Sequence, residues 1–124
     1  MLARSALTVI VLLAAVPASA ATLETSFAFA NGGQLLTCVV TNKSNKPLDV
    51  EVGFFGLSGS VVTPAFDFCN GAPLQPGDTC QLILDPDDDG RCVVTGKPKK
   101  LRANVTVFGP LPDRRVEAVL EATK

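Results

Sequence analysis

The chain has 124 residues, a formal net charge of −1, and no histidine, tryptophan or tyrosine. A charge so close to zero excludes the whole-molecule positive field that proteins use to bind nucleic acid. Without histidine, the chain cannot form a Ser-His-Asp triad, a Cys-His pair or an ordinary zinc hydrolase site.

The first 20 residues have the pattern of a secretory signal peptide. Arg4 precedes an apolar run over residues 6–16, and Ala18-Ser19-Ala20 has the A-x-A form of a cleavage site. The run is too short to cross a bilayer, which takes about 20 residues. We therefore expect cleavage after Ala20, a secreted or periplasmic product without a membrane span, and a single domain over residues 21–124.

The four cysteines of the chain are Cys38, Cys69, Cys80 and Cys92. In a small exported chain they indicate two disulfides, and the absence of both C-x-x-C and histidine argues against a zinc site. The sequence alone allows three pairings. We favour Cys69–Cys80, which closes a short loop rich in proline and glycine that we expect at the surface, and Cys38–Cys92, which ties together two strands far apart in the chain.

Alternation of apolar and polar residues with a period of two dominates the chain after the leader, and helix signals are scarce. The alternating segments, each bounded by turn residues, are 23–29, 36–41, 48–54, 61–68, 79–84, 91–95, 101–107 and 116–121. The inward set expected for the first segment is Leu23, Thr25, Phe27 and Phe29, and that for the last is Val116, Ala118 and Leu120. Pro64 indicates a sheet edge or a bulge. Residues 114–122 could instead form a short helix, but the preceding segment needs a strand partner. We predict an all-β antiparallel sandwich of about seven or eight strands, because no segment offers a crossover helix.

Six motifs follow one another along the chain: Cys38, Asn42-x-Ser44-x-x-Pro47, Val50-x-Val52, Leu74-x-Pro76-Gly77, Cys92-x-Val94 and Arg102-x-Asn104-Val105. In this order they resemble a loose group of small exported bacterial proteins of unknown function. The resemblance implies an immunoglobulin-like sandwich. It also implies that Cys38–Cys92 is the shared disulfide and that Cys69 and Cys80 are an addition of this chain. It implies no catalytic or binding residue.

Residues 85–90, the acidic turn, contain D-x-D-x-D-G, which is the first half of a calcium-binding loop. In that interpretation Asp85, Asp87 and Asp89 converge on one cation. The rest of the calcium pattern fails, because Gly96 stands where a bidentate glutamate belongs and Pro86 occupies the second position. The alternative is a solvated acidic hairpin turn that keeps neighbouring edges from pairing.

Residues 97–100 form a basic turn that, with Arg102, could touch an acidic partner or a lipid head group. The alternative is again a solvated turn. Asn42-Lys43-Ser44 and Asn104-Val105-Thr106 are glycosylation sequons, which matter only in a eukaryotic source.

Phe55 and Phe108 fall opposite the inward-facing sets of their strands. They could form an exposed apolar patch for a partner, or they could pack under a loop.

Few residues support catalysis. Asp49 and Glu51 share one strand face, whereas a glycosidase needs its carboxylates across a cleft. A Ser–Lys dyad would have to use Ser44, Ser58 or Ser60, and all three lie in turns. We therefore expect a non-catalytic envelope, structural or interaction protein that needs no cofactor. A calcium-dependent binding module and a small hydrolase are the alternatives.

Overall fold

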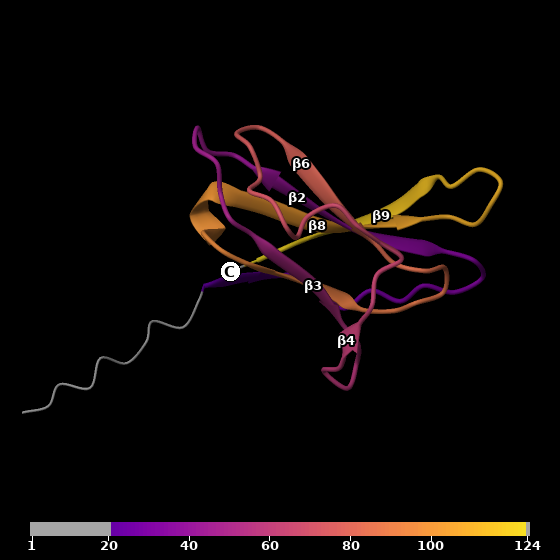
Figure 1. The fold of residues 1–124 in the computed structure, drawn as a ribbon. Coiled ribbons are helices and arrows are strands. Elements are labelled where there is room, and N and C mark those ends of the chain that lie inside the picture. Colours follow the sequence, from indigo (N-terminus) through magenta and orange to yellow (C-terminus); the bar gives the residue numbers. More distant parts are fainter. Residues whose placement is uncertain (1–20, 124) are drawn as a thin grey trace, which may run out of the picture.

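The computed structural model describes residues 21–123, which form two antiparallel β-sheets packed as a sandwich (Figure 1). The predicted all-β antiparallel fold is confirmed. Its strands are β1 (Thr22–Glu24), β2 (Leu35–Asn42), β3 (Glu51–Phe55), β4 (Val61–Val62), β5 (Phe66–Asp67), β6 (Thr79–Ile83), β7 (Arg91–Thr95), β8 (Leu101–Phe108) and β9 (Val116–Glu121), with one 3-10 turn, η1 (Pro98–Lys100). No helix among these residues has the length and hydropathy needed to cross a membrane.

One sheet has four strands in the order β1-β7-β3-β4, and the other has five in the order β5-β6-β2-β8-β9. The inward residues of β2 are Leu36, Cys38 and Val40, and all three are completely buried. Val105 on β8 and Val94 on β7 meet them from the neighbouring strand and the opposite sheet. The alternation therefore works as expected, because every second residue of these strands points into the same core.

The structure joins Cys38 to Cys92 and Cys69 to Cys80, the pairing that the sequence favours. Cys38–Cys92 links β2 of one sheet to β7 of the other, with Cα atoms 5.9 Å apart. We expected the shorter bridge at the surface, but Cys69 and Cys80 are both buried and belong to the hydrophobic core.

The expected strand over residues 61–68 is in fact two edge strands in different sheets. β4 pairs with β3 in the four-stranded sheet, and β5 pairs with β6 in the five-stranded sheet. Pro64 lies between them and cannot donate a ladder hydrogen bond. The chain changes sheet at this proline, which raises the number of strands above the expected one.

The first expected strand, over residues 23–29, ends early. Leu23 and Thr25 are buried, but the next buried residues are Ala28 and Ala30, and Phe29 is 60% exposed. Ala28 pairs with Gly90 only as an isolated bridge, so the regular ladder to β7 is interrupted after Glu24. The inward set that we assigned to Phe27 and Phe29 is therefore wrong.

The last strand is β9, as expected, and not a helix. Its inward set is shorter than expected, because a bulge interrupts the pairing with β8 between Val107 and Phe108. Leu120 packs against the core, whereas Val116 is 58% exposed. The β8–β9 hairpin extends beyond the rest of the sandwich, at the upper right of Figure 1.

Candidate functional site

The acidic turn lies next to the segment that precedes β2. Asp87 Oδ1 accepts a hydrogen bond from the Gly33 N–H at 2.7 Å, and Asp89 Oδ1 accepts one from the Ala30 N–H at 2.5 Å. The Asp87 N–H in turn donates to the Gln34 carbonyl oxygen. Two carboxylates of the turn therefore hold backbone donors of a segment more than 50 residues away in the chain.

The calcium interpretation does not fit this geometry. Within residues 21–123, no three acidic, cysteine or histidine side chains lie close enough together to hold a metal ion. Asp85, Asp87 and Asp89 do not converge, because the last two carboxylates point to the backbone of residues 30–33. The acidic turn is therefore fixed by hydrogen bonds to the connection that precedes β2.

The proposed catalytic carboxylates and serines are also placed. Asp49 and Glu51 are exposed beside the buried Val50 and Val52, as the alternation indicates. The Ser44 hydroxyl donates to Asn42 Oδ1 at 2.7 Å, and Ser58 and Ser60 hydrogen-bond to each other at 2.9 Å. The Ser44 hydroxyl also hydrogen-bonds to the backbone of Lys46, but none of these three hydroxyls hydrogen-bonds to the ammonium group of a described lysine.

Asn42 organises the connection between β2 and β3. Its side chain is completely buried, and its Nδ2 donates to the carbonyl oxygens of Lys46 and Leu74, at 2.8 and 2.9 Å. Its Oδ1 accepts from the Ser44 N–H. A buried amide engaged in this way cannot carry a glycan, so the first sequon is not a modification site in this fold.

Asp67 and Asn70 join the two sheets through side chains. Asp67 accepts hydrogen bonds from the backbone N–H groups of Cys69 and Asn70, and the Asn70 amide exchanges two hydrogen bonds with the backbone of Val52 in β3. Burial alone would raise the pKa of Asp67, but these hydrogen bonds outweigh it and leave the pKa below its usual range. The sequence analysis did not single out either residue, because their partners lie in other strands.

The outer face of the five-stranded sheet carries apolar side chains on every strand, interspersed with polar ones such as Thr41, Gln81 and Asn104. The outward-pointing apolar side chains on it are Leu35, Val39, Phe66, Phe68, Ile83, Phe108, Val116 and Val119. Phe66 and Phe68 stack with their ring centroids 6.2 Å apart, yet they remain 59% and 66% exposed. We call this surface the apolar outer face.

One row of paired residues crosses all five strands of this face. It consists of Phe66, Ile83, Thr37, Thr106 and Val119. The two threonines in the middle are buried although they point outward. The row therefore connects apolar side chains at the two edges of the face through two buried threonines.

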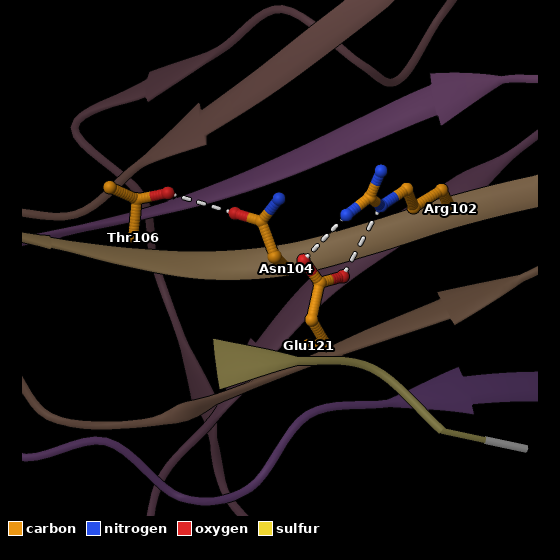
Figure 2. Close-up of polar contacts among 4 residues, drawn as sticks. All are labelled: Arg102, Asn104, Thr106 and Glu121. Atoms are coloured by element: carbon orange, nitrogen blue, oxygen red, sulfur yellow. Dashed lines mark hydrogen bonds and ion pairs between the residues drawn. The ribbon is translucent and has the colours of Figure 1, made fainter. Parts of the chain in front are cut away.

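The polar groups on this face satisfy one another (Figure 2). Arg102 on β8 forms an ion pair with Glu121 on β9 at 3.0 Å, and the Thr106 hydroxyl donates to Asn104 Oδ1 at 2.8 Å. The hydrogen bond and charge of Glu121 raise the pKa of the Arg102 guanidinium. The charges of Arg102 and Glu121 are therefore paired with each other.

Phe55 and Phe108 do point away from the core, but they do not form one patch. Phe55 lies on the outer face of the four-stranded sheet, opposite Arg91, whereas Phe108 lies on the apolar outer face beside Leu35. The outer face of the four-stranded sheet carries an ion pair as well, between Arg91 and Glu24, and in addition the exposed Glu51.

The basic turn meets a second basic connection at the opposite end from the acidic turn. The Lys43 N–H donates to the Lys100 carbonyl oxygen at 2.9 Å, so the connection after β2 lies beside η1. Figure 1 shows both segments at the left of the sandwich. The exposed lysines of the two segments, which we call the lysine cluster, are Lys43, Lys46, Lys97, Lys99 and Lys100.

Comparisons of the chain with protein-family models, with curated proteins and with solved structures found no match.

Proposed function

We propose that the protein is a non-catalytic, exported interaction module that docks a protein partner on its apolar outer face. The continuous row of side chains from Phe66 to Val119 carries this proposal. Soluble monomers rarely expose a large contiguous apolar surface, and such surfaces usually mark interaction sites. The outer face of the opposite sheet, which carries Arg91, Glu24 and Glu51, provides the internal contrast.

The chemistry of the face selects the kind of partner. Arg102 and Glu121 neutralise each other, so the face carries no excess charge to attract a strongly charged ligand. The fitting partner is a protein with a flat, uncharged, apolar surface of its own, such as another β-sheet. Phe66 and Phe68 would supply the large aromatic contacts that dominate binding energy at protein interfaces.

The export part of the proposal has separate support. Two disulfides in a chain of this size fit an oxidising compartment. The signal peptide that we expect over residues 1–20 lies outside the described residues. Secretion or periplasmic location would supply the oxidising environment that the four cysteines require.

Site-specific photocrosslinking in the cells that export the protein tests this function. A benzoylphenylalanine at position 66 or 119 should capture one defined protein, whereas the same group at Val93, on the opposite sheet, should not. The pair Phe66→Ser and Phe68→Ser should abolish capture from position 119, and Val93→Ser should leave it unchanged. No adduct at positions 66 and 119, or the same adducts from all three positions, would refute the proposed face.

A further inference from the structure

The two charged turns lie at opposite ends of β7, because the acidic turn precedes this strand and η1 follows it. We call these the acidic end and the basic end of the sandwich. None of the five lysines at the basic end forms an ion pair with a carboxylate among residues 21–123, in which the ion pairs involve only arginines. The described carboxylates at this end are fewer than the lysines and Arg102 together, and they are Asp49, Glu51, Asp78 and Glu121. The basic end is therefore positive.

The acidic end has the opposite charge. The acidic turn contributes four carboxylates, and the neighbouring β8–β9 hairpin adds two more. The cations at this end are three arginines, each of them already in an ion pair or bonded to a backbone carbonyl oxygen. Among residues 21–123, the side-chain hydrogen bonds of the acidic turn are made by Asp87 and Asp89, so the charges of Asp85 and Asp88 have no such partner.

An open hollow of about 640 Å³ lies at the basic end, between the start of β1 and η1. None of the residues around it is buried, and the surface that they expose to it is almost entirely apolar. They are Ala21, Thr22, Gly96, Lys97, Pro98, Lys99 and Lys100. Lysine stems can form such a wall while the ammonium groups stay in solvent. The hollow therefore suits a bulky apolar side chain that has carboxylates close to it.

Backbone hydrogen bonds hold the walls of the hollow. The Gly96 N–H donates to the Ala21 carbonyl oxygen at 3.3 Å, and the Lys100 N–H donates to the Lys97 carbonyl oxygen at 2.9 Å. The shape of the hollow is thus set before a ligand binds, which lowers the entropic cost of binding.

The acidic end presents a side chain of the kind that this hollow suits. Phe29 is largely exposed, and its ring packs against that of Phe27 with the centroids 4.8 Å apart. Ala28 exchanges two backbone hydrogen bonds with the last residue of the acidic turn, and the Ala30 N–H donates to Asp89 Oδ1. Because Ala28 and Ala30 are buried, the Phe29 side chain between them points away from the core. An exposed aromatic ring is thus fixed directly beside the acidic turn.

We infer that the basic end of one copy of the chain binds the acidic end of a second copy, with Phe29 in the hollow and the acidic turn facing the lysines. Opposite charges attract the two surfaces and set their orientation, and the aromatic ring adds apolar contact at the centre. The chain itself carries both complementary surfaces, which favours a second copy over an unrelated acidic partner. Because the two surfaces lie at opposite ends of each copy, the copies join head to tail. This inference is independent of the apolar outer face.

Sedimentation of the purified exported protein tests the inference. At low salt, the weight-average mass should rise steadily with protein concentration and exceed that of a dimer, because each head-to-tail contact leaves a further free end. About 0.5 M salt should shift this association to concentrations more than about tenfold higher, since it screens the attraction between the ends. A monomer at every concentration, or a closed dimer, would overturn the inference.

Two charge-reversed variants identify the ends that make contact. The basic-end variant is Lys97→Glu with Lys99→Glu, and the acidic-end variant is Asp85→Lys with Asp88→Lys. Each alone should associate more than about tenfold more weakly than the wild type, because like charges then face each other. An equimolar mixture should form a 1:1 complex, since each variant retains the end that the other has lost. If the mixture stays monomeric while circular dichroism shows both variants folded, the inference is overturned.

A third variant tests the aromatic contact. Phe29→Ser should weaken association more than about tenfold, whereas the matched control, Phe66→Ser on the apolar outer face, should change it less than about twofold. Phe29 and Phe66 are almost equally exposed, at 60% and 59%, so the two changes remove the same kind of surface. Equal losses in the two variants, or a loss confined to Phe66→Ser, would overturn the assignment of the contact to the hollow.

Discussion

At the acidic end of the sandwich, Asp87 and Asp89 accept hydrogen bonds from backbone N–H groups of residues 30–33, whereas at the basic end five lysines have no carboxylate partner among the described residues. The two clusters look equivalent in the sequence, as short charged turns between strands. In the structure the carboxylates stabilise the fold and the ammonium groups remain available. A charged turn is therefore a better candidate for binding when its charges have no structural partner.

The basic end is held instead by a neutral side chain. The Asn42 side chain donates to two backbone carbonyl oxygens and accepts from one backbone N–H group. These hydrogen bonds, and not ion pairs of the lysines, stabilise the basic end. The two ends thus differ in which residues stabilise them: charged ones at the acidic end, and a buried amide at the basic end. The predictions below vary one contributor at a time.

The largest effect on stability should come from removing the Cys38–Cys92 disulfide, which links the two sheets. Replacing Cys38 and Cys92 by serine should lower the free energy of unfolding by about 2–5 kcal/mol, because the unfolded chain regains its freedom and two hydroxyls enter the core. Urea denaturation measures this loss. Replacing Cys69 and Cys80 should cost less, since the loop they close is shorter. A larger loss for the short bridge would show that its burial outweighs its loop length.

At the basic end, Asn42→Ala should cost about 3 kcal/mol. The change removes three hydrogen bonds of a buried amide, two to the Lys46 and Leu74 carbonyl oxygens and one from the Ser44 N–H. The Leu74 carbonyl oxygen keeps its bond from the Leu48 N–H, whereas the Ser44 N–H loses its partner. Thermal denaturation of the variant beside Asn45→Ala, an exposed neighbour in the same turn, measures it. If both variants lose the same stability, the buried amide is not what holds this end.

The strands were predictable where burial follows a simple alternation. Leu36, Cys38 and Val40 show it, because both neighbouring strands keep the same register along their whole length. Phe29 does not, because the ladder to β7 breaks after Glu24 and the following buried positions are small alanines. The sequence pattern placed Phe27 and Phe29 in the core. The end of the β1–β7 ladder at Glu24 instead determines which side chains of this segment face inward.

The candidate sites depend on contacts that no local pattern contains. The partner of Asp89 is the Ala30 N–H, 59 positions away, and the neighbour of Lys43 is Lys100. The sequence identified both charged turns. It could not show that the aspartates of one accept backbone hydrogen bonds whereas the lysines of the other form no ion pair with a described residue. The apolar outer face was missed for the same reason, since its central row takes one residue from each of five strands.

At the acidic end, Asp87→Ala with Asp89→Ala should cost about 2 kcal/mol, because two backbone donors lose charged acceptors. Asp88→Ala is the matched control, since no side-chain hydrogen bond of Asp88 is seen in residues 21–123, and it should change stability by less than about 0.5 kcal/mol. Differential scanning calorimetry measures both. Millimolar calcium should not raise the melting temperature of the wild type, and a rise that disappears in the double variant would restore the calcium-binding alternative.

A third carboxylate tests whether this structural use of acidic groups is general. Asp67→Ala should cost about 1 kcal/mol at neutral pH through its lost backbone hydrogen bonds. Because the folded protein lowers the pKa of Asp67, its contribution is complete above the ordinary aspartate pKa of 3.8 and is lost as the pH falls through the lower folded value. The difference between wild type and variant should therefore shrink below about pH 4. Urea denaturation across that range checks it, and a constant difference would contradict the role of the carboxylate.

The smallest effect on stability should come from the lysine cluster itself. Replacing Lys97, Lys99 and Lys100 by glutamine removes three charges but no ion pair with a described residue, so stability should change by less than about 0.5 kcal/mol. Relief of repulsion among the neighbouring ammonium groups should make any change a slight gain at low salt, and the gain should disappear as salt screens it. Thermal denaturation at two ionic strengths measures this. A loss comparable to that of the Asp87 and Asp89 variant would mean that these lysines stabilise the fold, and the contrast between the two ends would fail.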